Sequence, residues 1–214
     1  MTIQKSRKKV GISQRIDHIE GRNELRDSID QRLIYWVIQA GFLPITIPNV
    51  LSIEPLNKNM LENWIQIMQI DALILSGGNN IGEYETRDTT ENLLLSWAEK
   101  DNIPVLGICR GMQMMAVWAN AEIIHKEGHI RCRHELEVVS EKNKWPKNVN
   151  SYHNFVLSSC PSGFNVAANS KDNSIEAIKH INLPWEGWMW HPEREVNFCL
   201  TDTLRFQNLV NYEK

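Results

Sequence analysis

The chain has 214 residues, of which 26 are acidic and 23 basic, and 42% are hydrophobic. This composition fits a globular protein and excludes disordered, collagenous and low-complexity classes. The net charge of −3 argues against a general nucleic-acid-binding protein, and no apolar run is long enough to span a membrane. We therefore expect one domain over residues 1–214, with neither nucleic acid nor membrane as a partner.

The start of the chain, MTIQKSRKKV, is basic but is not followed by an apolar run. It therefore does not resemble a secretory signal. The four cysteines are better explained as free thiols than as a disulfide framework. Both features predict a cytoplasmic protein.

The first half of the chain alternates short apolar runs with longer helical patterns. In chain order we expect a strand at 9–13, a helix at 25–40, a strand at 43–47, a helix at 59–69, a strand at 71–75, a helix at 90–101, a strand at 103–108 and a helix at 111–120. This alternation predicts an α/β domain with a largely parallel sheet.

After Ala121 the pattern changes. Residues 134–140 alternate as an antiparallel strand would. Further short strands or turns are expected at 150–157, 165–169, 174–179 and 188–190, and a closing helix at 201–211. Because no internal repeat and no flexible linker is visible in the sequence, the simplest arrangement is one domain with a β-rich insertion in its second half.

One cysteine lies in a pattern typical of a nucleophile. Cys109 follows an apolar run and precedes a helical pattern, with Gly107 two residues before it and Gly111 two residues after it. In a nucleophile elbow these two positions would collide if they carried side chains, so glycine is needed at both. The helix N-terminus favours a thiolate, and backbone N–H groups there can stabilise an oxyanion. The alternative is a buried cysteine beside two incidental glycines.

A thiol nucleophile needs a base, and His191 is the best candidate. It lies in the segment Trp190-His191-Pro192-Glu193, after an apolar stretch. Glu193 could accept a hydrogen bond from the imidazole and orient it. A single histidine is more often structural or exposed than catalytic, and the neighbouring carboxylate distinguishes His191 from that ordinary case.

These segments resemble the class I glutamine amidotransferase superfamily, and within it the γ-glutamyl-γ-aminobutyrate hydrolase group, or peptidase C26 family. The similarity extends from about Val10 to the C-terminus and rests on separated motifs in the same order. They are VGISQ (10–14), AGFLPITIP (40–48), LSGG (75–78), Arg87-Asp88 with Glu91, IPVLGICRGMQMM (103–115), VNSYH (149–153), SIEAI (174–178) and WHPE (190–193).

The resemblance implies a flavodoxin-like three-layer α/β sandwich, with a mostly parallel central sheet and a small antiparallel β extension. It also implies a triad in which Cys109 is the nucleophile, His191 acts as base and then acid, and Glu193 orients the imidazole. The implied substrate is a small γ-glutamyl amide, hydrolysed through a thioester to glutamate and an amine. The backbone N–H groups of Gly78 and Arg110 match the family's oxyanion hole.

Other matched positions imply a pocket for the glutamyl group. They are Gln113, Asn150, Ser151, Tyr152 and His153. Relatives often carry His and Gln directly after this segment, where this chain has Asn154 and Phe155, and they often carry Gln where it has Met189. We therefore expect the leaving-group side of the pocket to differ from that of relatives.

A short basic segment from Lys126 to Arg133 stands where relatives often have a longer, lid-like stretch. A cluster of this kind is usually a solvated face. The functional alternative is recognition of an anionic leaving group, to which Arg15 and Arg87 could contribute from the ends of strands. We hypothesise a leaving group that carries phosphate or a nucleotide.

Two other functions stay open. A glutaminase subunit would use the same triad but deliver ammonia to a separate synthetase partner, and a catalytically silent binding protein would need no intact triad. We expect no cofactor and no metal, because His125 and His129 have no clear third and fourth ligand and no Walker-type phosphate loop is present. The eight tryptophans would suit the face of a homodimer.

Overall fold

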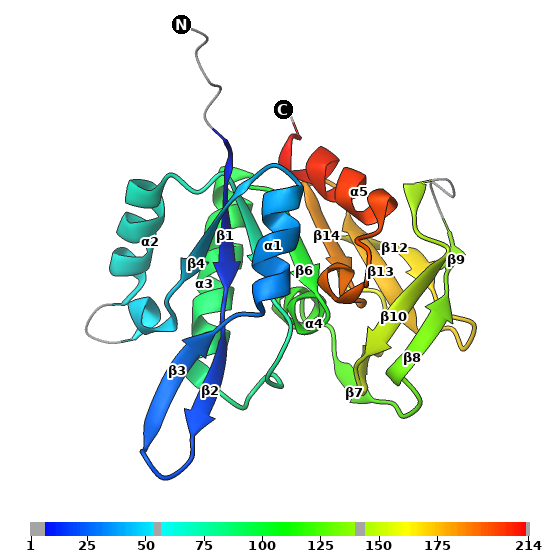
Figure 1. Ribbon diagram of the computed structural model, residues 1–214, viewed down its shortest axis with the longest axis horizontal. Helices are drawn as coiled ribbons and strands as arrows, with labels where there is room; N and C mark the ends of the chain where they lie inside the picture. The colour runs from blue at the N-terminus through cyan, green and yellow to red at the C-terminus, as the bar shows by residue number, and fades with distance from the viewer. Residues whose placement is uncertain (1–6, 54–56, 140–143, 213–214) are drawn as a thin grey trace, which may run out of the picture.

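The computed structural model describes residues 7–53, 57–139 and 144–212 (Figure 1). Over these residues the central sheet has eight strands. In spatial order they are β4 (Leu43–Ile47), β1 (Lys9–Ser13), β5 (Ala72–Leu75), β6 (Val105–Ile108), β14 (Trp185–Trp188), β13 (Ile175–His180), β12 (Phe164–Asn169) and β9 (Glu137–Val138).

The sheet changes direction after its fifth strand. The pairings from β4 to β14 are parallel, whereas β13, β12 and β9 continue the sheet with antiparallel pairings. Three two-stranded sheets extend from it: β2 (Arg15–Ile19) with β3 (Glu24–Ser28), β7 (Ile123–His125) with β11 (Phe155–Leu157), and β8 (Ile130–Glu135) with β10 (Asn148–Tyr152). The predicted α/β fold with a mostly parallel sheet and a small antiparallel extension is confirmed.

Helices cover both faces of the sheet, which gives three layers (Figure 1). Side chains alternate along the strands, so within β5 Ala72 and Ile74 belong to one core cluster, and Leu73 and Leu75 to the other. The helices are α1 (Gln31–Gln39) and α5 (Leu200–Val210) on the first face, and α2 (Asn57–Met68), α3 (Glu85–Asp101) and α4 (Arg110–Trp118) on the second. Short 3₁₀ segments lie at η1 (Asn49–Ser52) and η3 (Pro192–Arg194).

The expected helix at 25–40 is too long at its start. Its first residues form β3, which pairs with β2 in a hairpin closed by a turn with positive φ at Gly21 and Asn23. The helix begins only after Asp30, whose side chain accepts a hydrogen bond from the backbone N–H of Arg32. The cap and the turn together decide where the strand ends and the helix begins.

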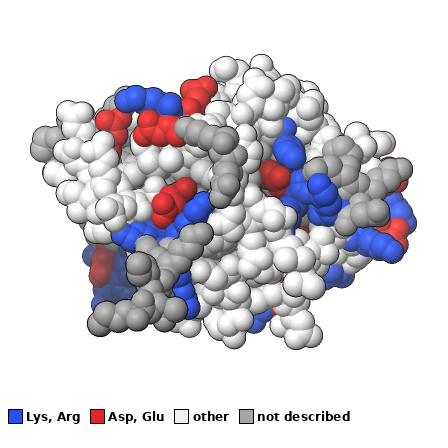
Figure 2. All heavy atoms as spheres, turned by 90° about the horizontal axis from the view of Figure 1, so that it is seen from above, with Lys and Arg blue, Asp and Glu red and all other residues white. Residues whose placement is uncertain are grey.

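Figure 2 shows the end of the molecule from which the parallel strands start, with basic side chains lying beside acidic ones in mixed groups. On that face, no surface of a single charge sign is formed by the described residues. Among the helices of the described ranges, none is long and apolar enough to cross a membrane.

An aromatic cluster lies beneath α5. The rings of Trp188 and Trp190 stack with their centroids 5.4 Å apart, and both side chains are buried, so they belong to the core. Nearby in α5, burial raises the pKa of Asp202 to about 7, and the charge of Glu195 also raises it. Between the ordinary pKa of an aspartate and about pH 7, this carboxyl group is therefore protonated in the folded state but ionised in the unfolded chain.

Asp202 therefore makes the free energy of unfolding fall as pH rises from its unfolded pKa towards about 7. The shift corresponds to a loss on the order of 4 kcal/mol. We expect Asp202→Asn to raise the unfolding temperature above that of wild type on the alkaline side of this window, and to change it little on the acid side. Thermal unfolding across pH measures this, with the exposed Asp101→Asn as control. Equal pH profiles for wild type and Asp202→Asn would contradict it.

Candidate active site

Cys109 lies between β6 and α4, on a strained strand-to-helix turn. Its φ of 51° and ψ of −105° lie outside the regions that ordinary residues adopt. A Cβ at Gly107 would lie 2.5 Å from Sδ of Met115, and one at Gly111 would overlap the carbonyl oxygen of Leu75. The close packing expected around both glycines is thus present, and the turn has the geometry of a nucleophile elbow.

His191 and Glu193 lie beyond the end of β14, which pairs directly with β6. Nδ1 of His191 is 2.6 Å from Oε1 of Glu193, and both side chains are almost fully buried. Because the carboxylate holds the proton on Nδ1, Nε2 is the ring nitrogen left to exchange a proton with the nucleophile.

The charges around His191 favour the imidazolium form. Burial alone would lower the pKa of His191, but interactions with the carboxylate of Glu193 and the sulfur of Cys109 together raise it to about 9. Burial acts to raise the pKa of Glu193, but the neighbouring imidazolium outweighs it and the pKa is lowered. Cys109, His191 and Glu193 are therefore electrostatically coupled, as a thiolate–imidazolium–carboxylate triad requires.

Asn150 fixes the backbone of the base. Its side-chain amide accepts a hydrogen bond from the backbone N–H of His191 at 3.0 Å and donates to the carbonyl of His191 at 2.8 Å. The same Nδ2 donates to Glu195 at 2.8 Å. The buried Asn150 therefore holds the base-bearing loop, and a contact between this residue and substrate stays a prediction.

Gly77 packs against the imidazole face. A Cβ at this position would lie 2.6 Å from Cε1 of His191, closer than real Cβ contacts come. We expect Gly77→Ala to displace the ring and to lower kcat by about 10²-fold, the cost of a misplacement of roughly 1 Å. Steady-state kinetics with a thermal unfolding curve would measure this.

Gly82→Ala is the matched control for that prediction. Gly82 lies on the same loop with a φ of +89°, so alanine there is strained, but its Cβ would meet no atom within 4 Å. If both variants lost activity equally, loop strain rather than contact with the base would explain the result.

The Gly77–Gly78 turn follows β5 and supplies one candidate oxyanion donor. Gly78 has a φ of +91°. Beneath the turn lies Arg87, whose side chain is fully buried and donates to the carbonyls of Ser76, Gly77 and Gly78 at 2.7–3.0 Å. The side chain of Arg87 thus holds the turn from below, and a contact between Arg87 and the leaving group stays a prediction.

The second candidate donor is the backbone N–H of Arg110, the first residue of α4. The guanidinium of Arg110 is buried, and it pairs with Glu91 and Asp88 of α3. Glu91 in turn accepts a hydrogen bond from Ser13 at 2.7 Å and pairs with Arg87 at 3.2 Å. This network links both candidate oxyanion segments through α3, so their relative position is set by buried charges.

A cavity of about 310 Å³ opens beside Cys109. Its lining includes Gly78, Arg110, Gln113, Tyr152, His153, Asn154 and Phe155. The Gln113 amide donates to the carbonyl of Phe155 at 3.0 Å, which ties the cavity wall to α4. Ser151 is fully buried and donates to the carbonyl of His129 at 2.5 Å, so its side chain lies behind the wall, and a contact with substrate stays a prediction.

A second cavity, of about 290 Å³, lies on the other side of Gly78 and includes His191 in its lining. Two arginines, Arg15 and Arg194, stand at its wall. Arg15 is half exposed and pairs with Asp17 at 2.8 Å, and the guanidinium of Arg194 lies 4.8 Å above the ring of Tyr152.

The basic segment from Lys126 to Arg133 lines neither cavity. Lys126 pairs with Asp172 at 2.7 Å, and Arg133 pairs with Glu195 at 3.0 Å. Its cations are therefore partly neutralised by the body of the protein. The sequence reasoning missed Arg194 and Gly77, although each lies directly beside a predicted site residue.

The chain is similar in sequence to known glutamine amidotransferases. A family model described as glutamine amidotransferase class-I matches residues 25–198. The "Gamma-glutamyl-CDP-amidate hydrolase" of Campylobacter jejuni is 40% identical over 132 residues, which cover 59% of this chain and 64% of that protein. The match therefore spans less than two thirds of that relative's length.

Two further comparisons point to the same family and fold. The glutamine-hydrolysing GMP synthase subunit of Pyrococcus furiosus is 30% identical over 166 residues, or 75% of this chain and 79% of that protein. A crystal structure of a putative GMP synthase subunit from Thermoplasma acidophilum superposes with a TM-score of 0.71 at 20% identity, covering 96% of this chain and 93% of the other.

Proposed function

The chain belongs to the glutamine amidotransferase class-I family, and from this premise we propose that it is a cysteine-dependent hydrolase of γ-glutamyl amides. The observation that carries the proposal is the Cys109–His191–Glu193 triad, set on a strained elbow between two cavities. A silent binding protein would have no need for this strain or for the coupled charges. The proposal assigns each of these features a chemical task.

In the first half of the reaction, the Cys109 thiolate attacks the γ-carbonyl carbon of the substrate. The oxyanion that forms accepts hydrogen bonds from the backbone N–H groups of Gly78 and Arg110. Collapse of this tetrahedral intermediate breaks the C–N bond, and the His191 imidazolium gives its proton to the leaving nitrogen. The products of this half are a γ-glutamyl thioester on Cys109 and a free amine.

In the second half, the now neutral imidazole of His191 takes a proton from water, and the resulting hydroxide attacks the thioester. Glutamate leaves, and the thiolate–imidazolium pair forms again. Glu193 stabilises the imidazolium in both halves and keeps Nε2 directed at the reaction. No cofactor enters this sequence of steps.

The position of the general acid assigns the two cavities. Because His191 must reach the leaving nitrogen, the leaving group belongs in the cavity that His191 lines, and the glutamyl group belongs in the cavity beside Gln113. Arg15 and Arg194 line the leaving-group cavity together with the carboxylates of Asp17, Asp30 and Glu193, and Arg15 also lines the cavity beside Cys109. Direct contact with the two guanidinium groups would bind an anion there. We propose a phosphate- or nucleotide-bearing leaving group, a proposal also supported by the Campylobacter jejuni relative's name.

A comparison of substrates tests this choice of leaving group. We expect kcat/KM for a γ-glutamyl phosphoramidate or a γ-glutamyl-CDP-amidate to exceed that for γ-glutamyl methylamide by about 10²-fold or more, the size of one to two charge-assisted contacts. Arg15→Gln should reduce that ratio, whereas Arg22→Gln, at the exposed tip of the β2–β3 hairpin, should not. Equal kcat/KM values for the charged and neutral substrates would refute the anionic leaving group.

A glutaminase that works with a synthetase is the second candidate. It is favoured by the similarity to the GMP synthase subunit of Pyrococcus furiosus. That match covers 79% of the relative, whereas the match to the Campylobacter jejuni hydrolase covers 64% of that protein. This candidate would be selected if glutamine were the only substrate that released glutamate, and if release required an added synthetase. Release from γ-glutamyl amides by the purified chain would select the hydrolase.

A further inference from the structure

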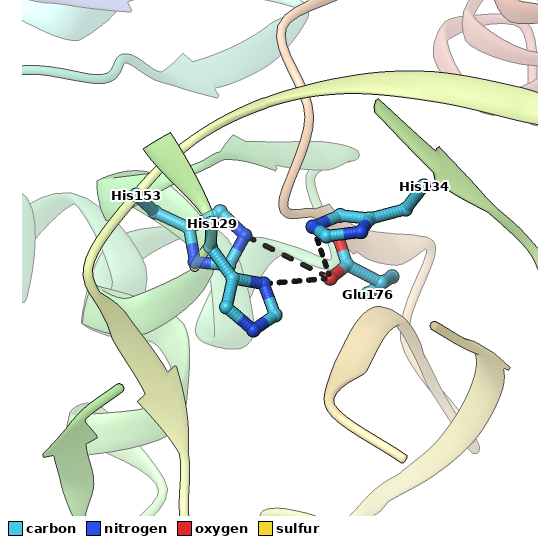
Figure 3. A group of neighbouring side chains, drawn as sticks. All are labelled: His129, His134, His153 and Glu176. Atoms are coloured by element: carbon cyan, nitrogen blue, oxygen red, sulfur yellow. Dashed lines mark ion pairs between the residues drawn. The ribbon is translucent and has the colours of Figure 1, made fainter. Parts of the chain in front are cut away.

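Three histidines and one glutamate converge away from the triad, between the small β8–β10 sheet and the central sheet. His129 lies just before β8, His134 lies within β8, His153 follows β10, and Glu176 belongs to β13. Figure 3 shows the three imidazoles directed at the carboxylate from different segments of the chain. One ligand-type atom from each of the four residues lies within 4.8 Å of all the others.

The distances within this cluster are similar for all three rings. Oε1 of Glu176 lies 3.8 Å from Nδ1 of His129, 3.7 Å from Nε2 of His134 and 3.7 Å from Nε2 of His153. These separations are too long for hydrogen bonds. In a tetrahedral zinc site, ligand atoms are roughly 3.3 Å apart, since each lies about 2 Å from the metal. A small inward movement of the side chains would therefore complete such a site.

The outer hydrogen bonds of two histidines fix which nitrogen faces inward with a lone pair. Nδ1 of His153 is 3.1 Å from the carbonyl of Phe155, which can only accept, so the ring proton is on Nδ1. Nε2 of His129 is 3.0 Å from the carboxylate of Asp172, which places its proton on Nε2. The nitrogens of these two rings that point at Glu176 therefore carry lone pairs, as metal-binding imidazoles do.

This arrangement is costly without a cation at its centre. Nδ1 of His129, Nε2 of His153 and both carboxylate oxygens of Glu176 are buried, and none of them has a hydrogen-bond partner among the described residues. Lone pairs on nitrogen repel those of a facing carboxylate oxygen, and buried polar atoms left without a partner destabilise the folded state. A bound cation would take the two imidazole nitrogens and a carboxylate oxygen of Glu176 as ligands, with Nε2 of His134 as the fourth.

We propose that His129, His134, His153 and Glu176 bind one divalent transition-metal ion, of which Zn²⁺ has the best-matched chemistry. Three imidazoles and one carboxylate are the donors that Zn²⁺ takes, whereas Mg²⁺ and Ca²⁺ prefer oxygen ligands alone. The contacts of His129 with Asp172 and of His153 with Phe155 supply the outer shell that orients such ligands. His134, whose side chain is 14% exposed, marks the path from solvent.

The site is structural, because four protein ligands fill a tetrahedral shell and three of the four residues are buried. The metal joins the β8–β10 region to β13 of the central sheet. His153 also lines the cavity assigned to the glutamyl group, so the metal would hold one wall of that cavity. The inference does not depend on the proposed function, since a metal clamp would be present in any of the candidate activities.

The metal content of the protein tests the inference directly. We expect the full chain, purified without a histidine tag from zinc-supplemented cells, to contain about one zinc per chain. Glu176→Gln and His134→Ala should each lower that content severalfold. The matched control is His125→Ala. His125 is exposed and lies four residues before His129, a spacing that suggests a ligand pair, but it is outside the cluster. This variant should keep its zinc.

A second measurement uses wild type alone, so that unstable variants do not decide the result. Wild-type protein stripped with a chelator should unfold at a lower temperature and regain its original value when Zn²⁺ is restored. Refilling with Co²⁺ should produce the intense visible absorption of a tetrahedral site, and Glu176→Gln should weaken it. Wild-type protein that is isolated without metal and whose unfolding temperature is unchanged by Zn²⁺ would overturn the inference.

Discussion

Replacing Cys109 with alanine is expected to abolish release of glutamate from every γ-glutamyl amide, a loss of roughly 10⁶-fold in kcat. The reason is that the elbow holds this sulfur, with strained backbone angles, beside a buried His191. No other group in the described part of the chain is placed to attack the carbonyl from that position. Glutamate release over time, measured with an enzyme-coupled assay, gives the rate.

The other thiols provide the controls. Cys160 lies before β12, and partial burial of its thiol raises the pKa, so it is a poor nucleophile. Cys160→Ala and Cys199→Ala should keep wild-type kcat. The Cys109→Ala variant should also keep the unfolding temperature of wild type within a few degrees. A Cys109→Ala protein that still released glutamate would remove Cys109 from the mechanism.

Glu193→Gln is expected to have the second largest effect, a loss of about 10²–10⁴-fold in kcat together with a changed pH profile. The carboxylate of Glu193 is one of the charges that raise the pKa of His191 to about 9, against the opposing effect of burial. His191 must be protonated to give its proton to the leaving amine, so wild-type activity should fall as pH rises through about 9. Without the carboxylate, the pKa falls and this decline moves to lower pH.

The pH dependence of kcat/KM measures that shift, and the direction of the shift is diagnostic. A purely structural role for Glu193 would lower activity equally at all pH values. Glu195→Gln is the matched control in the same loop, because Glu195 contacts Asn150 and Arg133 and not the imidazole. It should leave the position of the alkaline decline unchanged. An alkaline decline at the same pH in Glu193→Gln and wild type would contradict the assigned role.

The fold and the triad could be predicted because their signals are local in the sequence. Each apolar run or helical pattern can be recognised within its own short segment. The elbow likewise needs Gly107 and Gly111 two residues either side of Cys109. His191 and Glu193 are two residues apart, so their contact is also local. The helix start after Asp30 was not predicted, because residues 25–28 also fit a helical pattern. They pair with β2 instead, and this pairing depends on a turn that the pattern does not reveal.

The roles that depend on distant contacts could not be predicted in the same way. Arg87 was predicted to bind ligand from its place near a strand end, and Asn150 from its match to the family's pocket segment. Both side chains bond instead to backbone groups of the protein. His129 and His134 lie together at β8, but their partners are distant in the sequence, since His153 follows β10 and Glu176 belongs to β13. The spacing along the chain therefore gives no complete metal signature. Only the pairing of the sheets brings these residues together.

The most direct test of the account is detection of the acyl-enzyme. A γ-glutamyl phosphoramidate is mixed with the protein, the reaction is quenched in acid on a short time scale, and the intact mass is measured. We predict a mass increase of one glutamyl residue, mapped to the peptide that contains Cys109 and lost on alkaline hydrolysis. Rapid glutamate release without any such adduct, in wild type and in a slow variant such as Glu193→Gln, would contradict the thioester mechanism.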